Sequence, residues 1–159
     1  MIDAILEAWR IHDGINRYML DNITDEGLSA VPLLKNGQPG KGRDVTRQLA
    51  HMVDVRVSHF RAAERALMVG VAPFEKDRPP SRGRLEAALE ASSHGVEALF
   101  ERIVSGGEQV RKRGPLVLLA YLVSHESHHR GSIVLALKQN GIAPPEALRW
   151  GIWGKWFQQ

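Results

Sequence analysis

The chain has 159 residues, 43% of them hydrophobic and 25% charged, which predicts one globular domain over residues 1–159 and excludes disordered and fibrous classes. Its formal net charge is +3, and the basic residues are scattered among carboxylates apart from the run 111–113 and the set Arg56, Arg61 and Arg65, so a nucleic-acid partner is not favoured. The absence of cysteine excludes disulfides, thiolate metal ligands and a thiol nucleophile on the chain itself, and it fits a reducing cytoplasm.

A first helix is predicted from Ile2 to about Asn22, where apolar residues recur at helical intervals. Asp3 and Glu7 lie early in this segment, unlike the basic start of a signal peptide, so we expect no export signal and a cytoplasmic location. The next stretch, residues 27–43, is rich in glycine and proline and predicts a long loop with one short turn at most.

A second and a third helix are predicted from their end signals and apolar stripes. Asp44 is a suitable N-cap for the second helix, whose apolar stripe runs through Leu67 towards a stop at Gly70. Ser81 can open the third helix, which ends at the pair of glycines at 106–107.

The fourth helix is predicted to begin at Pro115, which suits the first helical position, and to end before Gly141. Its runs 116–123 and 133–137 are apolar on nearly every face, which indicates burial against several helices or at a dimer interface. The longer run is far below the about 20 residues that span a bilayer, so no membrane association is expected. Four long helices without strand signals predict an all-α fold, specifically a four-helix bundle.

An aromatic C-terminal tail follows the fourth helix and contains Trp150, Trp153, Trp156 and Phe157. We expect these aromatic side chains to cover one end of the bundle, because aromatic residues dominate core burial. An interface or a lid over a substrate is the alternative.

The fourth helix also contains a histidine pair with metal-ligand spacing. His125 and His129 are four residues apart, about 40° and one turn along a helix, so both imidazoles can reach one point. His51 lies near the beginning of the second helix and can point towards the core, which makes it the candidate third ligand. Three neutral imidazoles suit zinc, nickel, copper or iron(II) and leave coordination positions open, the pattern of catalytic sites.

Other side chains near this pair leave alternatives open. His128 follows His125 by three residues, so this pair is also geometrically possible, although we favour His129. Asp54 and Glu126 could orient an imidazole or move a proton, and a plain surface role is equally expected for Glu126. The remaining histidines have no partner at ligand spacing and are expected to be hydrogen-bonded or exposed; they are His12, His59 and His94.

The segments QLAHMVDVR (48–56) and SHESHHRGSIVLALKQNGI (124–142) resemble the DinB/YfiT-like superfamily. The likeness covers nearly the whole chain, includes Asn16 of the first helix and the aromatic tail, and is most specific in the HxxxHRG motif at 125–131. It implies an up-down-down-up bundle, commonly a homodimer, in which His51, His125 and His129 hold a divalent metal. The family often has Gln after HRG, where this chain has Ser132.

Relatives in this superfamily include thiol-dependent transferases and isomerases. Our leading hypothesis is therefore a metalloenzyme, a thiol transferase or a hydrolase, with one divalent ion (Zn, Ni or Fe) that activates water or a low-molecular-weight thiol for attack on a small electrophile. The second hypothesis is a non-catalytic metal-binding homodimer with a structural or stress-related role. Whether the protein is an enzyme stays open between these two, and a nucleic-acid or regulatory module is the weakest alternative.

Overall fold

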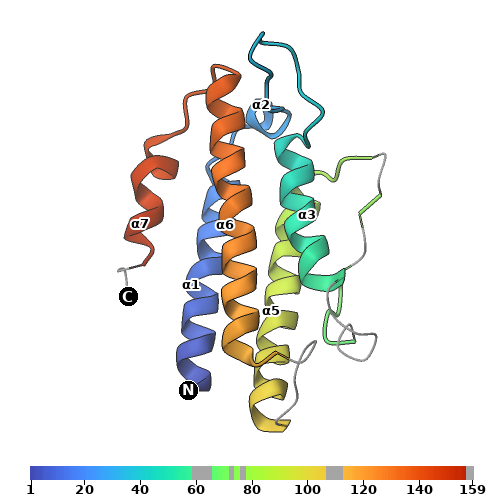
Figure 1. Ribbon diagram of the computed structural model, residues 1–159. Coiled ribbons are helices and arrows are strands. Elements are labelled where there is room, and N and C mark those ends of the chain that lie inside the picture. The colour runs from blue at the N-terminus through green and yellow to red at the C-terminus, as the bar shows by residue number, and fades with distance from the viewer. Residues whose placement is uncertain (59–65, 72–73, 76–77, 107–112, 157–159) are drawn as a thin grey trace.

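The computed structural model describes residues 1–58, 66–71, 74–75, 78–106 and 113–156 (Figure 1). Within these residues the named elements are all helical, which confirms the predicted all-α class, and one isolated β-bridge joins Leu33 to Pro39. The elements are α1 (Ile2–Asp21), α2 (Asp25–Leu28), α3 (Val45–Ser58), α5 (Arg82–Gly106), α6 (Pro115–Gln139), the π-helix η1 (Ala147–Gly151) and α7 (Ile152–Gly154).

The four longest helices, α1, α3, α5 and α6, lie side by side (Figure 1). Helices α1 and α6 run in one direction, while α3 and α5 run in the other. Helix α1 packs against α5 and α6, and α3 packs against the same two helices. The four helices therefore share one interior, and side chains from all four can meet there.

The predicted helix boundaries are largely confirmed by the capping contacts. The Asp44 carboxylate accepts a hydrogen bond from the backbone N–H of Arg47 at 2.7 Å, as an N-cap does. Pro115 is the first residue of α6, and Gly141 follows its end with a left-handed φ of 71° that favours glycine. The second helix is described as α3 from Val45 to Ser58, residues 59–65 lie outside the described part, and residues 66–67, which include Leu67 of the predicted stripe, form a turn.

The apolar interior consists of two clusters with a polar layer between them. The apical cluster lies near α2 and includes Met19, Leu49 and Ile133, while the basal cluster lies near the N-terminus and includes Trp9 and Leu122. Between them, buried polar side chains from all four long helices form the polar layer: His12, Asp13, Asn16, Arg56, Ser92, Ser93 and Glu126. This layer is the most unusual feature of the interior, because charged side chains are rarely fully buried.

The aromatic tail packs against the bundle through other residues than the predicted aromatic side chains. Leu148 joins the apical cluster, and the Lys155 ammonium lies 4.7 Å from the centre of the Tyr18 ring on α1. The tryptophans, however, are turned to the surface, so the expectation that they are buried over one end of the bundle is wrong. Trp150, Trp153 and Trp156 are 66%, 61% and 38% exposed, and Phe157 lies outside the described residues.

In the described part of the chain, no helix combines the length and the apolar character that crossing a membrane requires.

Candidate metal centre

The three histidines singled out by their spacing meet between α3 and α6. Each of His51, His125 and His129 can offer one ring nitrogen such that all three atoms lie within 4.8 Å of one another. Their ring centroids are 5.4 Å apart for His51 and His125, 5.1 Å for His51 and His129, and 4.7 Å for His125 and His129. The four-residue spacing on α6 therefore brings two imidazoles together, and α3 supplies the third.

The protonation state of His129 suits a metal ligand. Burial, followed by the neighbouring rings of His125 and His51, lowers the pKa of His129 from 6.5 to about 4. His129 is therefore neutral at pH 7, as an imidazole must be to donate a lone pair to a cation. Three half-buried imidazole donors in one place are the ligand set that zinc and other borderline divalent ions prefer. The residues present thus fit a divalent metal ion.

Gln48 and Tyr121 flank the triad from the same two helices. The Oε1 atom of Gln48 lies 3.5 Å from Nδ1 of His129, a long contact in which the ring N–H can donate to the amide oxygen. Gln48 also donates from Nε2 to the carbonyl of Arg43 at 3.3 Å, which orients the amide for this role. Tyr121 stacks on His125, one turn further along α6, with centroids 6.0 Å apart and planes 19° from parallel. Such contacts orient a ligand and select its free nitrogen.

The other described histidines do not belong to the group that could hold a metal ion, although the His128 ring lies 5.5 Å from that of His129. His128 is exposed on α6 and His94 is exposed on α5, so neither faces the shared interior. His12 is fully buried on α1, and its Nε2 lies 2.8 Å from the Glu126 carboxylate. The expectation of a hydrogen-bonded or exposed histidine is confirmed for His12 and His94, while His59 lies outside the described residues.

Glu126 follows His125 in the sequence but points away from the triad into the interior. Its side chain is fully buried, so the surface role considered for it is wrong. Its carboxylate accepts hydrogen bonds from four nitrogen atoms: Arg56 Nε at 2.7 Å, Arg56 Nη2 at 2.9 Å, Asn16 Nδ2 at 2.5 Å and His12 Nε2 at 2.8 Å. Four donors occupy this carboxylate, and Glu126 is not part of the three-residue group that could hold a metal ion.

Arg56 holds the polar layer together and is fully buried itself. Beside its two-point contact with Glu126, its Nη1 donates to Asp13 on α1 at 2.9 Å and to the Ser92 hydroxyl on α5 at 3.1 Å. Its guanidinium lies 4.8 Å from the centre of the Trp9 ring, also on α1. One side chain of α3 therefore contacts the other three long helices. The Arg56 guanidinium and burial have opposite effects on the pKa of Glu126, and the guanidinium prevails, with His12, to lower it to about 2.

The hydrogen bonds of His12 define its tautomer. Nε2 faces the ionised Glu126 and donates to it, while Nδ1 lies 3.4 Å from Arg130 Nη1 and accepts. Asn16 is oriented in the same way, because its amide donates to Glu126 and its oxygen accepts from Arg130 at 2.6 Å. Burial lowers the pKa of His12. This imidazole is neutral and serves as a link between a carboxylate and a guanidinium.

Asp54, the other carboxylate considered near the triad, is half-buried on α3. Burial raises its pKa, and a hydrogen bond with the backbone of Phe74 partly counteracts that effect. Asp54 is not part of the three-residue group that could hold a metal ion.

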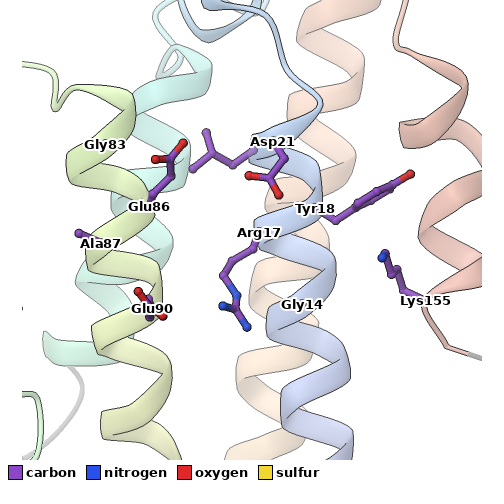
Figure 2. A pocket seen from close by; sticks show the side chains of 10 residues that line it. Gly14, Arg17, Tyr18, Asp21, Gly83, Glu86, Ala87, Glu90 and Lys155 are labelled. Atoms are coloured by element: carbon purple, nitrogen blue, oxygen red, sulfur yellow. The ribbon is translucent and has the colours of Figure 1, made fainter. Parts of the chain in front are cut away.

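A separate pocket of about 600 Å³ lies between α1 and α5 and extends to Lys155 (Figure 2). Charged side chains of both signs line it, including Arg17 and Glu90, and none of the three clustered histidines does. Arg17 is held there by an ion pair with the buried Asp13, Nε to Oδ2 at 3.0 Å. This pocket is therefore distinct from the candidate metal centre.

Comparison with known proteins agrees with the resemblance noted in the sequence. The chain is similar to a protein of Bacillus subtilis (strain 168) named "Uncharacterized protein YrdA", with 24% identity over 96% of this chain and 88% of that protein. No solved structure matches the chain described here. The DinB family model matches residues 1–149, a range that contains all three clustered histidines. The chain therefore belongs to the DinB family.

Proposed function

We propose that the protein binds one divalent metal ion, zinc, nickel or iron(II), through His51, His125 and His129. The observation that carries this proposal is the convergence of three imidazole nitrogens within 4.8 Å, one from α3 and two from α6, where His51 precedes His125 by 74 positions in the chain. A neutral His129 and the contact with Gln48 support it, because a ligand histidine commonly donates its second ring N–H to an oxygen acceptor. The directions of the four long helices, α1 and α6 one way and α3 and α5 the other (Figure 1), support the up-down-down-up four-helix bundle that the family resemblance implies.

We further propose that the centre is catalytic. Bound there, a divalent ion supplies a Lewis acid that lowers the pKa of water or of a small thiol and favours attack on a small electrophile. The chain contributes the three imidazole ligands, and its lack of cysteine means that any thiol nucleophile comes from a low-molecular-weight compound. Tyr121 is 42% exposed beside His125, so it is placed to contact an entering molecule.

A non-catalytic metal site is the second candidate function, and the position of the ligands on two different helices supports it. His51 belongs to α3, whereas His125 and His129 belong to α6, so a bound ion links two helices that already pack together. In that case the ion stabilises the folded chain without turnover of any substrate.

We also propose that the chain functions as a homodimer in the cytoplasm. Leu116 and Val117, near the start of α6, are large apolar side chains that are 59% and 52% exposed. Exposed apolar side chains grouped on one helix are typical of a protein interface. Val117→Glu is expected to give monomers in light scattering, whereas Leu34→Glu, in an exposed loop position, should leave the dimer intact.

Metal analysis of purified variants tests the metal proposal. The wild-type chain should carry about one divalent ion, and His125→Ala should lose it because one of three ligands is removed. His128→Ala is the matched control, since His128 is exposed on the same helix beside His129. Retention of the ion in His125→Ala contradicts the proposal. Thiol-dependent turnover that disappears in the same variant distinguishes the catalytic from the structural role.

A further inference from the structure

We propose that Arg56 and Glu126 are positioning residues for the histidine triad: their ion pair sets the spacing and rotation of α3 against α6, and thereby the distances among His51, His125 and His129. This inference rests on the proposed function, because the positions of the three imidazoles matter only if they bind a metal ion. The ion pair itself, and its effect on the imidazoles of the metal-free chain, do not depend on a metal.

The pair connects the same two helices that carry the three imidazoles. Arg56 follows His51 by five residues on α3, and Glu126 is next to His125 on α6. The contact is two-point, since Nε and Nη2 of the guanidinium reach Oε1 and Oε2 of the carboxylate at 2.7 and 2.9 Å. A two-point contact between planar groups restricts orientation as well as distance.

The direction of Glu126 determines where the neighbouring histidines point. On an α-helix Glu126 lies about 100° from His125 and about 60° from His129 around the axis. Because the carboxylate is fixed in the interior by donors from α1 and α3, rotation of α6 about its axis is blocked. The two imidazoles of α6 are consequently held towards α3, where His51 lies.

Stability alone does not explain a charged layer at this place. An apolar replacement of a buried ion pair is often neutral or even stabilising, because burial of the two charges is costly. The polar layer interrupts an otherwise apolar interior between the apical and basal clusters, at the part of α6 that carries the histidines. A role in fixing the positions of the adjacent histidines explains why an ion pair that is costly to bury lies here.

Two conservative variants separate positioning from charge. Arg56→Lys keeps the positive charge but cannot form the two-point contact, and Glu126→Gln keeps the size of the side chain but removes its charge. The matched control is Leu99→Ala, which creates a cavity in the basal cluster without touching the polar layer. Circular dichroism of each sample gives the folded fraction, to which the binding stoichiometry is normalised.

The first measurement is Zn(II) affinity, by competition with a chromophoric chelator. We expect both polar-layer variants to bind Zn(II) 10- to 100-fold more weakly, a loss as large as that on removal of a group that directly orients a ligand, and Leu99→Ala to bind like the wild type. The second measurement is the nuclear Overhauser cross-peak between the His51 and His129 rings in metal-free protein, whose centroids are 5.1 Å apart. This cross-peak should weaken in both polar-layer variants and persist in Leu99→Ala.

The outcomes distinguish this inference from the proposed function. Unchanged Zn(II) affinity in both variants, or a lower affinity with an unchanged ring cross-peak, overturns the positioning role while leaving the metal centre intact. If the wild-type chain binds none of Zn(II), Ni(II) and Fe(II), the proposed function fails, and the cross-peaks of the metal-free variants still decide whether Arg56 and Glu126 position the rings.

Discussion

The guanidinium of Arg56 and the carboxylate of Glu126 form a two-point ion pair between α3 and α6, and neither side chain is exposed to solvent. The pair lies beside the clustered histidines without joining them. The residues that hold α3 against α6 are therefore adjacent to the residues that could bind a metal ion, but they are different residues. This separation has consequences that can be measured.

Replacement of Glu126 by alanine should destabilise the fold strongly. Removal of the carboxylate leaves the buried Arg56 with Asp13 as its remaining ionic partner and leaves His12 and Asn16 without their acceptor. Loss of one member of a buried pair typically costs about 3 to 5 kcal/mol of unfolding free energy, which urea denaturation can measure. Glu97→Ala, which removes an ion pair on the surface, is the control and should change stability little.

Acid should destabilise the wild-type chain more than Glu126→Gln. The pKa of Glu126 falls from 4.5 to about 2 in the folded state, so the unfolded chain takes up a proton at a higher pH than the folded chain does. The stabilisation from this group is complete above about pH 4.5 and is lost as the pH falls towards 2. Urea denaturation of metal-free protein between about pH 6 and pH 3 should give a shallower decline for Glu126→Gln. Parallel curves for the two proteins would contradict this role of the carboxylate.

Zinc should raise the melting temperature through the histidine triad. At a free concentration 100 times its dissociation constant, an ion that binds only the folded chain adds about 2.7 kcal/mol of stability. His51→Ala and His125→Ala should lose this increase, because each removes one of the three clustered imidazoles. His128→Ala should retain it, and a chelator should reverse it. An equal increase in all three variants would show that zinc binds elsewhere.

Gln48→Ala should weaken zinc binding by about tenfold. The amide oxygen of Gln48 lies 3.5 Å from Nδ1 of His129 and favours the tautomer that leaves Nε2 free. Isothermal titration calorimetry can measure the change. Gln38→Ala, in the exposed loop before α3, is the control, and identical affinities of the two variants would exclude a role for Gln48.

Much of the fold was predictable because its signals are local. Asp44 caps α3 and Pro115 begins α6, as their side chains and backbone geometry favour. The spacing of His125 and His129 places both imidazoles on one side of α6 by helix geometry alone. The contribution of His51 depended on which helices become neighbours, so its position on the second helix made it a candidate ligand, and the family resemblance implied the same residue.

The polar layer could not be predicted with the same assurance. Glu126 continues the stripe of Leu118 and Leu122, and Arg56 continues that of Leu49 and Met52, so helical periodicity alone indicates burial of both. A charged residue is nonetheless normally expected at the surface, and only tertiary packing reveals that these two charges meet. The exposure of Trp150 and Trp153 was missed for a related reason, since aromatic spacing does not determine which face of a tail packs against α1.

Anomalous diffraction from crystals grown with zinc tests the metal centre most directly. We expect one peak at the zinc absorption edge, about 2.0 to 2.1 Å from a ring nitrogen of each of His51, His125 and His129. A peak bound by other residues, or no peak beside these three imidazoles, would contradict the proposed site.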